Sequence, residues 1–220
     1  AAVTSASLAV AIGLIDVSGA TAVVDLDWSN LAVAGSPRSG RSTALATVAT
    51  VLLRQHDDVF VVGPRSSPLA AFGFPRSAFG RAAEVAPFLD QVATHLALGG
   101  PDHRVVLVVD DVDTFDDPIL SPIFERLANA DSLRVVGSLE SRAMTGYTTS
   151  ALVGLLRRAR RLLVLQPEDP SAFLQATGVK LPTRPGLRMP PGRGVLLVDR
   201  TPTIVQLAVV PGTTANSGEG

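Results

Sequence analysis

The fold of this 220-residue chain is decided by the octet Gly35-Ser36-Pro37-Arg38-Ser39-Gly40-Arg41-Ser42. The octet matches the phosphate-binding pattern G-x-x-x-x-G-K-[ST] except at one position, where arginine replaces lysine. An apolar, strand-like run (31–34) precedes it, and an alanine-rich stretch of helical character (43–54) follows it. A strand, a glycine-rich loop and a helix in this order are the context that a nucleotide-binding loop requires.

The composition limits the class of protein. With 46% hydrophobic and 18% charged residues, the chain has enough apolar side chains for one compact domain. A net charge of −1 argues against holding nucleic acid by charge alone, although a local basic patch or an assembled ring stays open. The chain has no cysteine, which excludes disulfides and thiolate metal sites. Its apolar runs are too short to span a bilayer, and a first residue other than Met suggests a fragment of a longer protein.

Alternating strand and helix patterns predict an α/β fold, with a mostly parallel sheet and helices on both of its faces. We expect strands at 22–26, 31–34, 59–62, 104–110, 133–137 and 162–165, and helices at 43–54, 81–98, 118–130, 149–159 and 169–177. Asp169 is the expected N-cap of the last helix and Gly178 its stop. The segment 64–80 is rich in Pro, Gly and Ser and is expected to be a loop.

The C-terminal part predicts a different arrangement. Two runs, 194–199 and 203–210, are expected to form an antiparallel β-hairpin that turns at 200–202. We therefore predict one domain over residues 1–210, followed by a flexible, low-complexity tail at 211–220.

The octet predicts how phosphates would be held. Glycines allow backbone N–H groups to face the phosphates, and the following helix adds positive charge at its N-terminus. The residues expected to bind ATP are Gly35, Ser36, Pro37, Arg38, Ser39, Gly40, Arg41, Ser42 and Thr43. In this interpretation the amides of residues 38–42 form the cradle, the Ser42 hydroxyl binds Mg²⁺, and Thr43 lies near the α-phosphate. The alternative is a Gly/Ser-rich turn that caps a helix and binds nothing.

A second pattern supports the nucleotide interpretation. The apolar run 105–109 is followed by Asp110 and Asp111, which places both carboxylates at the carboxyl edge of the sheet. Asp110 is the expected second Mg²⁺-binding residue, acting through water. Asp111 stands where many such ATPases have a glutamate that polarises the attacking water, and its side chain is one methylene shorter. The alternative is a strand that ends in an acidic turn.

Arg41 and Asp111 are the candidate catalytic residues, and both depart from the usual pattern. Arginine keeps the charge of lysine, but its longer planar fork positions that charge differently. We therefore expect nucleotide binding with slow hydrolysis or none. Ser138 either senses the γ-phosphate or belongs to a strand-end turn, and Glu140 and Arg142 are weaker candidates.

Two further groups receive no catalytic role. The basic cluster at 157–161 is either a nucleic-acid or arginine-finger surface or, more in keeping with its place at a helix end, a solvated group that favours the helix dipole. His56, His95 and His103 are scattered along the sequence without metal-ligand spacing.

Three segments resemble the FtsK/SpoIIIE family of RecA-like P-loop ATPases, most closely the C-terminal, degenerate ATPase modules of EccC-type type VII secretion proteins. They are LAVAGSPRSGRSTAL at 31–45, VVLVVDDVD at 105–113, and MPPGRGVLLV at 189–198 with IVQLA at 204–208. The third segment is the most discriminating, because a PPGRG turn that leads into a terminal hairpin is not a general P-loop feature. The resemblance covers about residues 9–210 and implies a RecA-like P-loop NTPase fold.

The resemblance also implies a setting. Such modules lie in tandem on a membrane-anchored protein at the cytoplasmic face of the membrane, bind ATP and Mg²⁺, and form hexamers. They act with neighbouring ATPase modules, and one module binds the C-terminal signal of a secreted helical substrate. Two alternatives stay open: an active FtsK-type DNA-translocating domain, and an interaction domain that binds no nucleotide. The absence of a recognisable winged-helix extension counts against the DNA motor.

Overall fold

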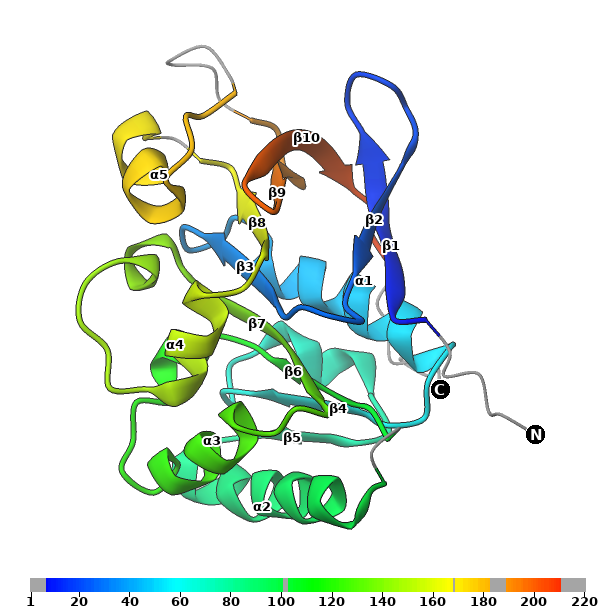
Figure 1. Cartoon of the computed structure of the whole chain (residues 1–220), viewed down its shortest axis with the longest axis vertical. Helices are drawn as coiled ribbons and strands as arrows, with labels where there is room; N and C mark the ends of the chain where they lie inside the picture. The colour runs from blue at the N-terminus through cyan, green and yellow to red at the C-terminus, as the bar shows by residue number, and fades with distance from the viewer. Residues whose placement is uncertain (1–6, 101–102, 168, 183–188, 211–220) are drawn as a thin grey trace, which may run out of the picture.

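The valine-, alanine- and leucine-rich runs form the parallel centre of one sheet. In the computed structural model, which describes residues 7–100, 103–167, 169–182 and 189–210, ten strands pair in the order β2-β1-β10-β9-β8-β3-β7-β6-β4-β5 (Figure 1). The parallel strands are β3 (Leu31–Gly35), β4 (Val59–Gly63), β5 (Ser77–Phe79), β6 (Val105–Val109), β7 (Leu133–Glu140) and β8 (Arg161–Leu165). β3, β4 and β6 are buried at every position, as expected of strands that helices cover on both faces.

β7 separates the strand that enters the octet from the strand that ends in the two aspartates. It pairs with β3 on one side and with β6 on the other, both in parallel register. The carboxyl ends of all three strands therefore meet at one edge of the sheet, as predicted.

The antiparallel part is larger than the sequence predicted. β9 (Arg193–Val198) and β10 (Thr201–Leu207) form the expected hairpin, and β1 (Ala9–Ile15) and β2 (Thr21–Asp25) extend the same flank. β1 was not predicted. The turn at 200–202 was predicted wrongly, because Asp199 and Arg200 form it, with positive φ angles of 48° and 69°. Two such residues give the tight turn whose twist suits a hairpin.

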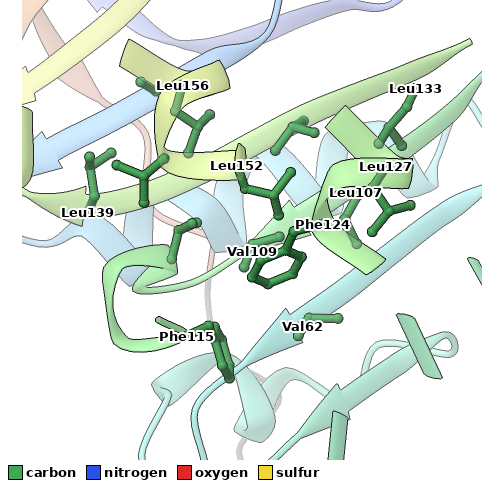
Figure 2. Packing of buried hydrophobic residues seen from close by; sticks show 14 of the residues in the cluster. Val62, Leu107, Val109, Phe115, Phe124, Leu127, Leu133, Leu139, Leu152 and Leu156 are labelled. Atoms are coloured by element: carbon green, nitrogen blue, oxygen red, sulfur yellow. The ribbon is translucent and has the colours of Figure 1, made fainter. Parts of the chain in front are cut away.

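Five α-helices cover the described sheet on both faces. They are α1 (Arg41–Leu53), α2 (Ala82–Leu98), α3 (Ser121–Ala128), α4 (Ala151–Arg157) and α5 (Pro170–Thr177). α1 packs on one face, whereas α2, α3, α4 and α5 contribute side chains to the core on the other. Figure 2 shows that second core, where Phe124 of α3 and Leu152 of α4 lie over Val109 of β6. The prediction of a mostly parallel, helix-covered α/β fold is confirmed.

Local signals placed some boundaries well and others poorly. Asp169 caps α5 by accepting a hydrogen bond from the Ser171 amide, and Gly178 ends it in the left-handed conformation, as predicted. α3 begins three residues later than expected, because Asp117 holds a turn by accepting a hydrogen bond from the Ile119 amide. The expected loop 64–80 contains β5 and a 3₁₀ helix, η1 (Pro68–Phe72).

Some predictions lie outside what the structure describes. The predicted tail at 211–220 falls on residues that are not described. Within the described residues, no helix combines the length and the apolar character needed to cross a membrane.

Candidate nucleotide site

The octet connects β3 to α1 through a tightly wound loop. A Cβ on Gly35 would lie 2.2 Å from Ser39 Oγ, so a larger residue there would have to displace the Ser39 side chain. Gly40 has a φ of 97°, a conformation in which an L side chain is strained. The Ser39 amide donates to the Ser36 carbonyl across a distance of 3.1 Å. The path of the backbone therefore favours glycine at position 40, and Gly35 leaves room for the Ser39 side chain.

The start of α1 is suited to an anion. Gly40 provides no side-chain cap, and no acidic residue lies in the first turn. The amides of a first helical turn have no carbonyl partner within the helix, and the helix dipole adds positive charge there. Ser36, Pro37, Arg38 and Thr43 are exposed around this turn. The loop can thus present backbone N–H groups to a phosphate.

The two residues predicted to bind Mg²⁺ are brought together. Asp110 is fully buried, and its Oδ2 accepts a hydrogen bond of 2.9 Å from the Ser42 hydroxyl. The same oxygen accepts a second hydrogen bond, of 2.6 Å, from Ser67, which follows β4. Carboxylate and hydroxyl oxygens are the hard ligands that Mg²⁺ prefers. Ser42 and Asp110 therefore fit a Mg²⁺ ion shared with bound phosphates.

Ser138 of β7 connects the two aspartates. Its hydroxyl donates to Asp110 Oδ1 at 2.6 Å and accepts from the Asp111 amide at 2.8 Å. Because β7 lies between β3 and β6, this serine stands directly beside the buried carboxylate. A sensing role for Ser138 remains a prediction, and its structural role is to fix the turn at Asp111.

Arg41 bends back over the loop that it belongs to. Its Nη1 donates to the Gly35 carbonyl at 2.6 Å, and its Nη2 forms an ion pair of 2.7 Å with Asp111 Oδ1. The arginine side chain is only 10% exposed. The two candidate catalytic residues are therefore bound to each other.

Asp111 has an unusual backbone and an unusual charge environment. Its φ of 46° is left-handed, which is uncommon for a residue other than glycine. Burial raises the pKa of the Asp111 carboxyl, and the negative charges of Asp110 and Asp113 add to that effect, while Arg41 opposes it. The ion pair with Arg41 thus offsets part of the cost of keeping a second carboxylate next to Asp110.

A cavity opens beside the loop, between β8, α5 and the 3₁₀ helix η3 (Ser141–Met144). It has a volume of about 410 Å³, within the range of small-molecule sites. Ser36 of the octet, Arg142, Gln166 and Phe173 are among its lining residues.

The weaker candidates Glu140 and Arg142 form an ion pair of 2.5 Å at this edge, and Glu140 lies in register with Gly35.

Ser67 was missed by the sequence reasoning. It is buried, donates to Asp110 and accepts a hydrogen bond from the Leu69 amide at the start of η1. Its position shortly after the buried strand β4 was a signal, because polar residues after parallel strands gather at the same edge.

The basic cluster at 157–161 makes structural contacts. Arg157 donates to the carbonyls of Ala143, Thr145 and Gly146. Arg161 pairs with Asp199 beside the hairpin turn. These contacts favour the structural interpretation of the cluster over a binding surface.

The histidines are less scattered than the sequence suggested. His95 and His103 meet at Asp58, whereas His56 is not part of this group. The histidines still have no metal-ligand spacing along the sequence, and the fold brings two of them to one carboxylate from separate elements.

The fold that carries this site is similar to that of several ATPases of known structure. EssC ATPases 2 and 3 from Geobacillus thermodenitrificans superpose with a TM-score of 0.74 at 18% identity, over 96% of this chain. ATPases 2 and 3 of Thermomonospora curvata EccC, in complex with a signal sequence peptide, superpose with a TM-score of 0.69 at 17% identity, over 94% of this chain. This chain has the fold of the EccC and EssC ATPase domains.

The chain covers less than half of the length of the EssC and EccC chains to which it is similar. The chain spans 43% of that EssC chain, 41% of that EccC chain and 26% of the whole EccC cytoplasmic domain. The conjugation coupling protein TcpA, solved with ATPγS, is more distant, with a TM-score of 0.60 at 14% identity over 90% of this chain and 65% of that chain. No protein-family model and no curated protein matches the sequence.

Proposed function

We propose that this chain is an ATP-binding module of a type VII secretion ATPase, with weak or no hydrolysis of its own and a regulatory or docking role. The observation that carries the proposal is the ion pair of 2.7 Å between Arg41 and Asp111, set in an otherwise complete phosphate-binding loop. The loop retains the backbone amides and the hydroxyl that bind phosphate and Mg²⁺. The ion pair, in contrast, engages the carboxylate that hydrolysis would use.

The geometry of the loop supports the proposed binding of ATP. The β- and γ-phosphates would lie at the N-terminus of α1, and Mg²⁺ would lie against Ser42 and Asp110. Arg41 lies beside the same turn and adds positive charge near the phosphates while its Nη2 stays paired with Asp111. The adjoining cavity lined by Ser36 and Phe173 has room for the base.

Hydrolysis needs a carboxylate that is free to orient a water molecule. Asp111 is the residue at that position, and its Oδ1 is bound to Arg41. Aspartate also reaches less far than the glutamate that most such ATPases use. Both features lower the expected turnover without weakening nucleotide binding.

The proposed partners rest on analogy with the proteins that share the fold. The EccC structure contains two ATPases in one chain and a signal sequence peptide. By analogy, this module packs against neighbouring ATPase modules, in a hexamer, at the cytoplasmic face of the membrane as part of a membrane-anchored protein. It either regulates those modules or binds the C-terminal signal of a secreted helical substrate.

Thermal unfolding with Mg-ATP tests the binding proposal. ATP at 100 times its dissociation constant should add about 2.7 kcal/mol of stability. For a domain of this size we expect the melting temperature to rise by about 5–10 °C. Arg41→Ala should remove most of that rise. Arg54→Ala is the matched control, because Arg54 lies exposed at the other end of α1 and should leave it intact. Absence of any shift at millimolar ATP would contradict the proposal.

The second candidate is an active DNA-translocating ATPase, which the likeness to a conjugation coupling protein favours. It requires turnover that double-stranded DNA stimulates. We expect no stimulation, because the net charge is −1 and Asp111 is paired. A clear increase of ATPase activity with DNA length would support this candidate instead.

A further inference from the structure

A second group of polar residues lies at the opposite edge of the sheet from the nucleotide loop. Asp58 directly precedes β4, His103 lies two residues before β6, and His95 is in the last turn of α2. Because β4 and β6 are parallel neighbours, their amino ends lie side by side at this edge. One ligand atom from each of the three side chains lies within 4.8 Å of the others.

The individual contacts show how the side chains are aimed. His95 Nε2 lies 2.9 Å from Asp58 Oδ1, and His103 Nδ1 lies 3.8 Å from Asp58 Oδ2. The two imidazole rings meet edge to face, with centroids 4.9 Å apart. Each of the two nitrogens therefore faces one oxygen of the same carboxylate.

The surrounding packing holds this arrangement. The Phe60 ring lies against His95, with centroids 5.6 Å apart. Gly99 ends α2 and leaves space for His103, since a Cβ at that position would lie 2.3 Å from the His103 ring. The C-terminal end of α2 also favours a positive charge nearby. The three side chains are thus pre-positioned by packing that does not depend on their own contacts.

We propose that Asp58, His95 and His103 form a binding site for a divalent transition-metal ion of the Zn²⁺ type. Two imidazoles and one carboxylate are a ligand set that zinc accepts, with a fourth position left for water. Bonds of about 2.0–2.1 Å in tetrahedral geometry separate neighbouring ligand atoms by roughly 3.3 Å, and His103 Nδ1 lies 3.8 Å from Asp58 Oδ2, close to that separation.

Arg76 has a defined place in this site. Its Nη1 donates to Asp58 Oδ1 at 2.7 Å, and its guanidinium lies over the Phe60 ring. An outer hydrogen bond of this kind orients a ligating carboxylate. Oδ2, which faces His103, is then the oxygen available to the metal. The ion would join the start of β4, the start of β6 and the end of α2.

The metal site is independent of the proposed ATP site. One offers imidazole nitrogen, and the other offers only hydroxyl and carboxylate oxygen. Failure of ATP binding would leave the metal proposal untouched, and failure of metal binding would leave the ATP proposal untouched.

Titration calorimetry with ZnCl₂ tests the proposal on the chain freed of metal by a chelator. We expect one Zn²⁺ per chain, and binding that weakens at pH 5, because metal ions compete with protons for their ligands. The double variant His95→Ala/His103→Ala should weaken Zn²⁺ binding by at least about 100-fold. His56→Ala is the matched control, because it removes the third histidine of the chain and should leave the affinity unchanged.

Two further measurements guard against misfolding and against zinc bound elsewhere. The single variant His95→Ala removes a side chain that is 40% exposed, so the fold should persist while the affinity falls by at least about tenfold. Co²⁺ in place of Zn²⁺ should give the visible absorption of a tetrahedral site in the parent chain and none in the double variant. Zn²⁺ binding of equal strength in the double variant would overturn the proposal, as would loss of binding in His56→Ala alone.

Discussion

The two edges of the parallel sheet each hold a carboxylate, and the groups around these two carboxylates differ in charge. At the carboxyl edge, Asp110 is buried among the hydroxyls of Ser42, Ser67 and Ser138, and the neighbouring Asp111 has a raised pKa. At the amino edge, Asp58 faces Arg76 and two histidines. Burial alone would raise the pKa of Asp58, but the hydrogen bonds from Arg76 and His95 and the charges of both histidines lower it.

This difference in charge indicates which kind of metal ion each edge favours. At the carboxyl edge the carboxylates of Asp110 and Asp111 are adjacent, and Arg41 pairs only with Asp111, so a further cation such as Mg²⁺ is favoured beside Asp110. The amino edge already balances its carboxylate with an arginine, and it offers imidazole nitrogens to a metal. The same sheet therefore separates a hard oxygen site from a softer nitrogen site.

The largest expected effect is on ATP turnover and comes from substitutions at the carboxyl edge alone. Arg41→Lys combined with Asp111→Glu should raise the ATP turnover by at least about 100-fold, because it restores both side chains that depart from the usual pattern. Single-turnover hydrolysis of radiolabelled ATP measures the effect. The control is Arg54→Lys, which changes the exposed arginine at the far end of α1 and should leave turnover unchanged. An unchanged rate in the double variant would mean that the missing element comes from a neighbouring module.

A smaller effect tests how tightly the Asp110 carboxylate is held. Ser67→Ala should lower the free energy of unfolding by about 2 kcal/mol, because it removes a buried donor to Asp110. Ser66→Ala is the matched control, since Ser66 is the exposed neighbour and its loss should change the stability by less than about 0.5 kcal/mol. Urea denaturation compares the two. Equal effects would show that Ser67 does not hold the carboxylate.

The smallest effect contrasts the two edges through pH. The folded pKa of Asp111 is raised, so its ionisation costs stability as the pH rises above the ordinary value of 3.8. Asp111→Asn should therefore stabilise the free protein at neutral pH, and that gain should vanish below 3.8. The folded pKa of Asp58 is lowered, so its contribution is complete above 3.8 and is lost as the pH falls through the lowered value.

Asp58→Asn should accordingly destabilise the protein above that pH and become neutral in strong acid. Urea midpoints measured between pH 2 and 7 compare the two variants. The same sign of change in both would show that the two edges do not differ as described.

The sequence predicted the carboxyl edge because its residues lie in contiguous motifs. The octet, Asp110 and Asp111 follow buried strands directly, and parallel strands bring such positions together. Ser67 was missed because it lies in a Pro- and Gly-rich segment whose path depends on η1 and β5. The cluster at Asp58 was missed because its members come from three separate elements, and no spacing along the chain reports that contact.

The antiparallel flank was underestimated for a related reason. β1 is a short run in which small residues alternate with larger apolar ones, a weak signal without its partner β10. The turn at Asp199 and Arg200 was misplaced because neither residue is the glycine or asparagine that usually marks left-handed backbone.

The pairing of β1 with β10 has a mechanical consequence. These strands are antiparallel neighbours, with Gly13 opposite Leu207, so the chain enters β1 and leaves β10 at the same end of the pair. Tension applied between those two points would load the hydrogen bonds one after another, as in opening a zipper, and not all together. A module that is pulled through its connections should therefore yield first at this flank, while the sheet that carries the nucleotide loop stays intact.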